Sequence, residues 1–179
     1  MNRHLLLVLI ALALGTAPSL AQSQQPYAGL EARSIKALSE QQIADLRAGR
    51  GMGLALAAEL NGYPGPMHVL EMADALDLSS QQRAKMQELF AAMKAEALPL
   101  GERLIAQEAE LDKAFAGKTV TPASLAAATD AIGTTHSALR QTHLKYHLSA
   151  VEVLTPAQIQ RYSELRGYKG GMQHPHSQH

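Results

Sequence analysis

The sequence predicts an all-α protein, an antiparallel hairpin of two long helices with short flanking helices. Alanine and leucine dominate over β-branched residues, and apolar residues recur every three or four positions without sustained strand alternation. Clusters of proline and glycine divide these helical patterns. Only 4% of the 179 residues are aromatic. The hairpin would therefore have a thin core, and we expect a second copy to complete it in a bent homodimer.

The first residues, 1–21, have the pattern of a secretory signal peptide. A basic start at Arg3 precedes an apolar run from Leu5 to Leu14, and small residues surround a cleavage site after Ala21. The alternative is a membrane anchor, but an anchor needs about 20 apolar residues, and Gly15 interrupts this run. No later segment of the sequence is apolar enough to span a membrane. We therefore expect a periplasmic protein that is soluble after the signal is removed.

A polar segment follows, and we predict that residues 22–38 form a disordered linker before a helical domain over residues 39–167. The first helical pattern starts after Ser39 and is interrupted at Gly49–Gly53, which reads Gly-Arg-Gly-Met-Gly. Each glycine inside a helix costs about 1 kcal/mol relative to alanine. A phosphate-binding loop would need a preceding strand and a P-loop lysine, and neither is present. The pattern favours a close approach of two helices or a break between them.

The clearest turn is Asn61–Pro66, which combines a C-cap glycine with two prolines. Pro66 is then expected to open a short helix over Met67–Leu76. His68 and Met72 would lie one turn apart on this helix, with Glu71 beside them. These side chains are candidate metal ligands.

The longest helical pattern starts after Ser79 and ends at Gly117. Its apolar positions alternate three- and four-residue steps, as in the seam of a coiled-coil-like pair: they are Met86, Phe90, Met93, Ala97, Leu100, Leu104, Leu111 and Ala114. Pro99 removes one backbone hydrogen bond inside this helix, which predicts a bend. Met86, Phe90 and Met93 are interpreted first as core residues. The alternative is a client-binding surface, for which adaptable methionine and aromatic side chains are suited.

Thr121-Pro122 predicts the start of the second long helix, with threonine as the N-cap and proline at the first helical position. His136, His143 and His147 fall on the face that points towards a partner helix. His143 and His147 are one turn apart. One interpretation is a pair of polar residues that form hydrogen bonds at a helix interface. The other is a pair of imidazole ligands for Zn, Cu or Ni.

A metal site at these histidines would need a ligand from another helix. His136 lies about 10.5 Å along the helix axis from His143 at 1.5 Å per residue, which is too far for easy sharing of one ion. The best candidates are His68, Glu71 and Met72, and a sulfur ligand favours copper. The metal hypothesis therefore places one divalent or cuprous ion between the short helix and the second long helix, with His68, Met72, His143 and His147 as its ligands.

Three helix starts share one short motif. Leu154-Thr155-Pro156-Ala157-Gln158 has two looser copies, Leu78-Ser79-Ser80-Gln81-Gln82 and Leu38-Ser39-Glu40-Gln41-Gln42. In each copy a hydroxyl residue can cap the helix, and the glutamine three positions later can reach back to the cap. Leu154, Thr155 and Gln158, together with Leu78, Ser79 and Gln82, are the residues that define the motif.

These helix starts resemble the LTxxQ motif of the Spy/CpxP family of small periplasmic helical proteins. The resemblance extends from about Tyr27 to Tyr168. It implies a bent, all-helical homodimer whose concave side holds unfolded proteins without ATP, and its relatives include metal-binding stress proteins and metal sensors. Similarity to the metal-sensing branch rests on His68-x3-Met72 and His143-x3-His147. The concave side of the chaperones is basic, whereas this chain has 16 basic and 16 acidic residues.

We therefore expect an ATP-independent chaperone for unfolded envelope proteins. The alternative is a periplasmic sensor or resistance protein for heavy metals, and a third class is a purely structural interaction module. No catalytic arrangement is evident, so the sequence predicts a protein that is not an enzyme and requires no cofactor. The chain lacks cysteine and has no basic footprint for nucleic acid. Residues 168–179 are predicted to be a polar tail whose histidines are solvated or bind metal weakly.

Overall fold

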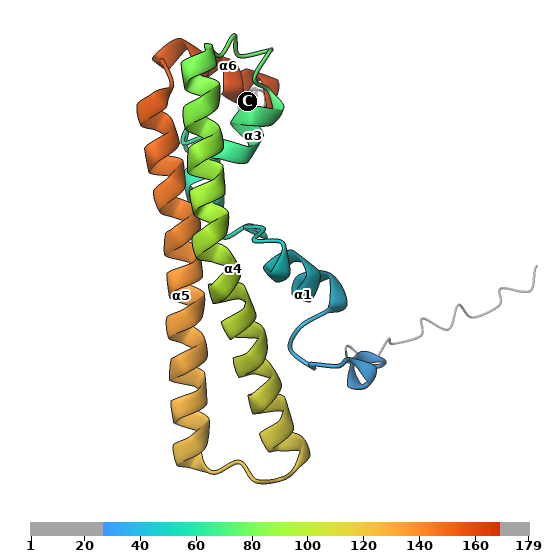
Figure 1. Cartoon of the computed structure of the whole chain (residues 1–179). Helices are drawn as coiled ribbons and strands as arrows, with labels where there is room; N and C mark the ends of the chain where they lie inside the picture. The colour runs from blue at the N-terminus through green and yellow to red at the C-terminus, as the bar shows by residue number, and fades with distance from the viewer. Residues whose placement is uncertain (1–26, 169–179) are drawn as a thin grey trace, which may run out of the picture.

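The computed structural model describes residues 27–168 and shows two long helices packed as a hairpin, with the short helices gathered around one part of it (Figure 1). Helix α4 spans Ser80–Ala116 and α5 spans Pro122–Val153. The other elements are η1 (Leu30–Ala32), α1 (Glu40–Arg47), α2 (Leu56–Glu59), α3 (Pro66–Glu71) and α6 (Pro156–Leu165). The predicted all-α hairpin is confirmed. The predicted signal peptide and residues 169–179 of the predicted tail lie outside the described residues.

The helix starts are formed by the side chains that the sequence indicates. Ser39, Ser79 and Thr155 each form a capping box with the glutamine three positions later. Thr121 caps α5 in the same way with Ser124, and Pro122 occupies the first helical position. These reciprocal bonds satisfy backbone N–H groups that a helix leaves free at its start.

Two predicted boundaries are wrong. The helix after Pro66 ends at Glu71 and not at Leu76, because the chain turns again before Leu78. The predicted linker is structured in its second part: η1 forms at Leu30–Ala32, and the side chains of Ile35 and Leu38 are buried. These two apolar side chains belong to the core that α1 builds against α4.

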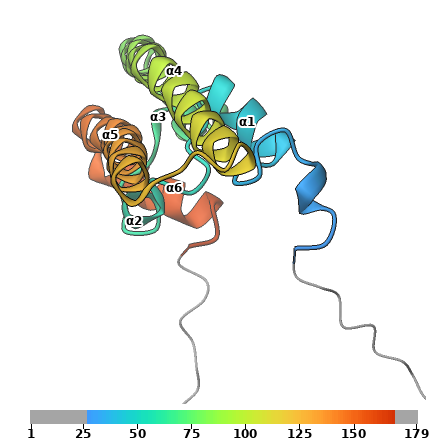
Figure 2. The same cartoon turned by 90° about the horizontal axis from the view of Figure 1, so that it is seen from below.

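The glycine-rich segment Gly49–Gly53 is a break between two helices, as one sequence interpretation proposed. α1 ends at Arg47 and α2 begins only at Leu56. Gly49 and Gly53 have φ values of 67° and 84°, a left-handed conformation that glycine adopts without steric cost. The break turns the chain from α4, which α1 contacts, towards α5, which α2 contacts (Figure 2).

Helix α4 contains Pro99 and changes direction in its middle (Figure 1). A proline inside a helix lacks an N–H donor and clashes with the preceding turn, which accounts for the bend. α1 packs on α4 just beyond it. A Cβ atom on Gly101 would lie 2.6 Å from the backbone oxygen of Leu46, so the approach of the two helices depends on glycine at this position.

The buried apolar residues form two clusters along the hairpin. The middle cluster joins α1, α4 and α5, and its members are Ile35, Leu38, Ile43, Leu46, Ala97, Leu104, Ile105 and Leu139. The end cluster joins the segments around α3 and α6 to the long helices, and its members are Val69, Ala73, Leu76, Leu78, Met86, Ala150, Leu154 and Tyr162. Within the described part of the chain, none of the helices has the length and apolar composition needed to cross a membrane.

Candidate metal centre

A cavity of about 460 Å³ lies between the two clusters. Along α4 it is bordered by residues 90–94, between the cluster residues Met86 and Ala97, and along α5 by His143 and His147. The glycine-rich loop, α2 and the start of α3 close its other sides. The lining residues are Ala48, Gly49, Arg50, Gly51, Met52, Gly53, Ala55, Leu56, Glu59, Gly65, Pro66, Met67, His68, Phe90, Met93, Lys94, His143 and His147.

The two α5 histidines are buried under backbone from two separate loops. A Cβ atom on Gly51 would lie 3.3 Å from Nδ1 of His143, and one on Gly65 would lie 2.8 Å from Cε1 of His147. Real Cβ atoms do not approach as closely as the second distance, so Gly65 cannot carry a side chain without moving the ring. The loops bury His143 and His147 to 3% and 8% exposure.

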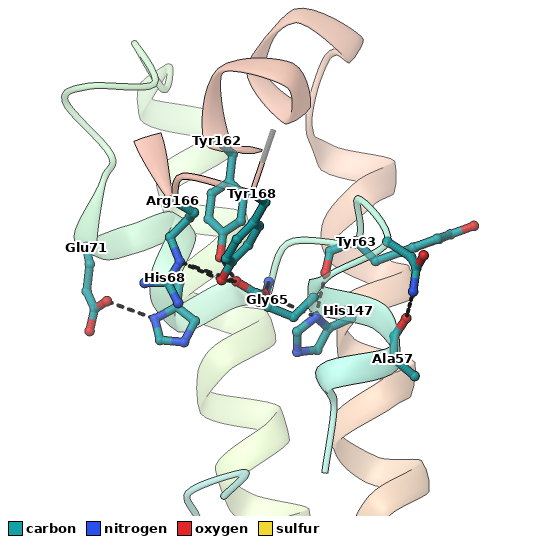
Figure 3. Close-up of polar contacts among 11 residues, drawn as sticks. Ala57, Tyr63, Gly65, His68, Glu71, His147, Tyr162, Arg166 and Tyr168 are labelled. Atoms are coloured by element: carbon teal, nitrogen blue, oxygen red, sulfur yellow. Dashed lines mark hydrogen bonds and ion pairs between the residues drawn. The ribbon is translucent and has the colours of Figure 1, made fainter. Parts of the chain in front are cut away.

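The protonated nitrogen of His147 is set by its hydrogen bond. Nδ1 lies 2.6 Å from the carbonyl oxygen of Tyr63 (Figure 3). A carbonyl only accepts, so Nδ1 donates and neutral His147 keeps a lone pair on Nε2. His68 is held similarly, because its Nδ1 lies 2.9 Å from the Glu71 carboxylate. An imidazole whose Nδ1–H is held by a carbonyl or carboxylate is oriented as metal-binding histidines are.

His143 presents a buried nitrogen without a protein partner. Among the described residues, no hydrogen-bond partner reaches its Nε2 atom. Burial lowers the pKa of His143 below its ordinary value, and the nearby His147 lowers the pKa further. The ring is therefore neutral near pH 7 and able to donate a lone pair. A buried polar atom without a partner costs about 1–3 kcal/mol, so this position is costly unless a ligand satisfies it.

One carboxylate beside the cavity is committed to structural bonds. Glu59 is 7% exposed, and the hydroxyl groups of Tyr162 and Tyr168 both donate to its Oε1 atom (Figure 3). The backbone N–H of Gly65 donates to Oε2 at 3.3 Å, and Nε of Arg166 lies 3.5 Å from Oε1. Sequence reasoning missed this cluster, because no pattern pairs Glu59 with residues more than 100 positions away. It also assigned Tyr168 to a free tail, which is wrong, since Tyr168 anchors the C-terminal segment to α2.

The structure brings His68, His143 and His147 to the same cavity, but not Met72. The partly buried Met72 packs against the end cluster around Val69 and does not line the cavity. No three histidine, aspartate or glutamate side chains within residues 27–168 lie close enough together to hold a metal ion. The four-ligand arrangement predicted from sequence is therefore not formed as proposed.

The three residues suggested as a client-binding surface fall into two environments. Met86 is fully buried in the end cluster, which agrees with its interpretation as a core residue. Phe90 and Met93 line the cavity. Met52 and Met67 line it as well, and sequence reasoning did not consider them as ligands. Met52 follows Gly51 directly and Met67 follows Gly65 by two positions, but the contact of these glycines with the histidines could not be predicted from sequence spacing.

The two strongest motif copies bind each other. Nε2 of Gln82 donates to Oε1 of Gln158 at 2.8 Å, and Nε2 of Gln158 donates back to Oε1 of Gln82 at 3.1 Å. Gln82 also donates to the carbonyl of Val153, and Gln158 to that of Leu76. The motif therefore joins the starts of α4 and α6 as well as capping them.

Comparison with known proteins gives one result. Residues 48–161 match the family model described as heavy-metal resistance. The match covers both long helices, the lining of the cavity and Glu59. Neither a curated protein nor a solved structure matches the chain.

Proposed function

Because the chain belongs to the heavy-metal resistance family, which comprises Spy/CpxP-like proteins, we propose that it binds a heavy-metal ion in the cavity through Nε2 of His143 and Nε2 of His147. In this role it acts in the periplasm, where the signal-peptide pattern of residues 1–21 directs it. Capture of the ion there keeps it away from other envelope proteins.

The observation that carries this proposal is the buried Nε2 atom of His143. His143 lines the cavity, its Nε2 atom has no hydrogen-bond partner among the described residues, and burial lowers the pKa of its ring, which keeps the ring neutral. His147 lies one turn away with its Nδ1–H held by Tyr63, so its own lone pair is also on Nε2. Two imidazoles at positions i and i+4 share one helix face, and imidazole nitrogens suit a transition metal.

The test is metal titration of the purified exported protein by calorimetry and native mass spectrometry. To exclude the tail, the titration is made with His174, His176 and His179 replaced by glutamine. We expect one bound ion per chain and loss of that binding in the double variant His143→Gln/His147→Gln.

His136→Gln is the matched control. His136 lies on the same helix but is exposed and does not line this cavity, so its replacement should leave the affinity unchanged. Equal affinity in the double variant and the unchanged protein would refute the proposal.

The second candidate function is ATP-independent binding of unfolded envelope proteins. It is favoured by the apolar wall that Phe90 and Met93 form in the cavity and by Leu56 at its edge, which is 53% exposed. Aggregation of a reduced client protein should then be slowed by equimolar protein and less so by Leu56→Ser. Leu148→Ser, at a residue 56% exposed but outside the cavity, is the control. A client that aggregates at the same rate with and without the protein would exclude this function.

A further inference from the structure

We infer that the ion is a soft monovalent cation, Cu(I) or Ag(I), and that the thioethers of Met52, Met67 and Met93 coordinate it beside His143 and His147. The inference rests on the proposed metal-binding function and specifies the class of ion. It replaces Met72, the sulfur ligand expected from sequence, with three methionines that line the cavity itself.

The first two methionines are placed by the same glycines that pack on the histidines. Gly51 packs on the ring of His143, and Met52 is the next residue. Gly65 packs on the ring of His147, and Met67 follows it by two positions. Each loop that covers an imidazole therefore brings a thioether side chain to the same cavity.

Met52 occupies an uncommon backbone conformation. Its φ angle is 43°, in the left-handed region that residues with a side chain rarely adopt. Such conformations cost of order 1–3 kcal/mol, and Asp77 and Lys118 adopt them as well, at turns outside the cavity. Here the conformation holds Met52 at the edge of the cavity, where it is 41% exposed, accessible to an arriving ion.

Met93 supplies a thioether from the opposite wall. It lies on α4, is 7% exposed and lines the cavity. The three sulfur-bearing side chains thus come from three segments around the histidine face of α5. Such an arrangement surrounds an ion, whereas methionines from one helix would offer sulfur from one side only.

The charges around the cavity favour a monovalent ion. Imidazole and thioether ligands are neutral, and Glu59 is occupied by two tyrosine hydroxyl groups and the N–H of Gly65. Lys94 also lines the wall, with its ammonium 5.9 Å from the centre of the Phe90 ring. The Glu59 carboxylate lies 3.8 Å from Nδ1 of His147, but its oxygens accept these hydrogen bonds, so the side chains left to coordinate an ion are neutral and favour a low ionic charge. Thioether and imidazole together are ligands that Cu(I) accepts readily.

The test compares ions and methionines in the tail-substituted protein described above. Ag(I), which needs no reductant, and Cu(I), held under anaerobic conditions with a chromogenic competitor, are titrated beside Zn(II) and Ni(II). Methionine is labelled with ¹³C at the ε-methyl group, and single leucine substitutions assign its signals. We expect Ag(I) to shift the signals of Met52, Met67 and Met93 and to leave those of Met72 and Met86 in place.

Affinity gives the second measurement. We expect each of Met52→Leu, Met67→Leu and Met93→Leu to lower the affinity for Cu(I) and Ag(I) by about tenfold or more, with Met72→Leu as the unaffected control. Unchanged methyl signals with Ag(I), or a triple leucine variant that binds Ag(I) as tightly as the unchanged protein, would overturn the inference. If His143→Gln/His147→Gln still abolished binding in that case, the proposed function would stand. If the triple leucine variant and the His143→Gln/His147→Gln variant both kept their binding of Ag(I), the inference and the proposed function would both be overturned.

Discussion

The two halves of the hairpin use the same long helices but differ in what they bury. We call the half on which the short helices pack the covered half, and the half near the connection between α4 and α5 the loop end. α5 buries seven residues between Thr135 and Ala150 and none between Pro122 and Thr134. The last buried residue of α4 is Ile105, eleven positions before its end. The short helices pack on the covered half (Figure 1), and the segment before α1 reaches beyond it through an ion pair of Lys36 with Asp112 at 3.5 Å. The long helices alone therefore do not create a buried environment for histidines; the added segments do.

The cavity differs from the two clusters on either side of it in the types of residue that surround it. The clusters are filled mainly by leucine, isoleucine and alanine side chains, whereas the space between them is lined largely by glycine, methionine and histidine residues. Closely packed cores leave few voids. The glycines at positions 51 and 65 let the backbone pack directly on the two histidine rings, and the cavity beside these rings is left unfilled by side chains.

The largest expected effect comes from Gly101, where α1 meets α4. Gly101→Ala places a Cβ atom 2.6 Å from the backbone oxygen of Leu46, and a backbone atom cannot move aside cheaply. We predict a loss of about 3 kcal/mol in the free energy of unfolding, measured by urea denaturation. Gly133→Ala, which meets nothing within 4 Å on α5, should instead stabilise the protein by about 0.5–1 kcal/mol. Similar losses in both variants would show that α1 does not depend on this contact.

The second effect concerns Glu59 and its tyrosine partners. Tyr162→Phe removes a buried donor to a carboxylate, and we predict a loss of about 2 kcal/mol in the free energy of unfolding. Tyr63→Phe, at an exposed ring, is the control and should change it by less than about 0.5 kcal/mol. A loss in Tyr162→Phe no larger than in the control would contradict the assigned role of this bond.

The same substitution should change the response to alkali. Burial raises the pKa of Tyr162 above its ordinary value of 10.0, and the hydrogen bond and charge of Glu59 raise this pKa further. The folded protein therefore keeps this proton while the unfolded chain releases it, so the contribution of Tyr162 is complete below pH 10 and is lost as the pH rises beyond it. We expect the free energy of unfolding of Tyr162→Phe to fall less steeply above pH 10 than that of the unchanged protein.

A smaller effect separates the motif copies. Gln82 and Gln42 both close a capping box, but Gln82 also donates to Gln158 and to the carbonyl of Val153. We predict losses of about 1.5 kcal/mol for Gln82→Ala and about 0.5 kcal/mol for Gln42→Ala in the free energy of unfolding. Thermal denaturation of both variants measures the difference. Equal losses would mean that the bonds between motif copies add nothing to the caps.

The sequence predicted the parts of this fold that depend on local chemistry. Caps at Ser79, Thr121 and Thr155 and the break at Gly49–Gly53 follow from a few neighbouring residues, and the structure confirms them. Less of the candidate site could be predicted from the sequence. The spacing of His143 and His147 identified one wall, because helix periodicity determines which residues share a face.

The other walls depend on loops whose paths the sequence does not determine. Met72 has the expected helical spacing from His68, yet α3 ends before it and its side chain packs into the end cluster. Met52 and Met67 have no helical relation to the histidines and reach the cavity only through the glycine contacts. Glu59 meets Tyr162 and Tyr168 across more than 100 residues. Such long-range contacts leave no periodic signal in a single sequence.

The smallest expected effect lies at the loop end of the hairpin. Phe115 is 53% exposed, and a groove of about 400 Å³ lies nearby between α4 and α5, lined by apolar residues such as Leu111, Ala114 and Ala128. Because Phe115 is not part of either cluster, Phe115→Ser should change the free energy of unfolding of the monomer by less than about 0.5 kcal/mol.

The expected homodimer makes a separate prediction for the same variant. If a second copy covers this end, the variant should dissociate at higher protein concentration than the unchanged protein in sedimentation experiments, with unfolding of the dilute monomer unaffected. A variant that unfolds more easily as a monomer would instead show that the loop end contributes to the core of a single chain.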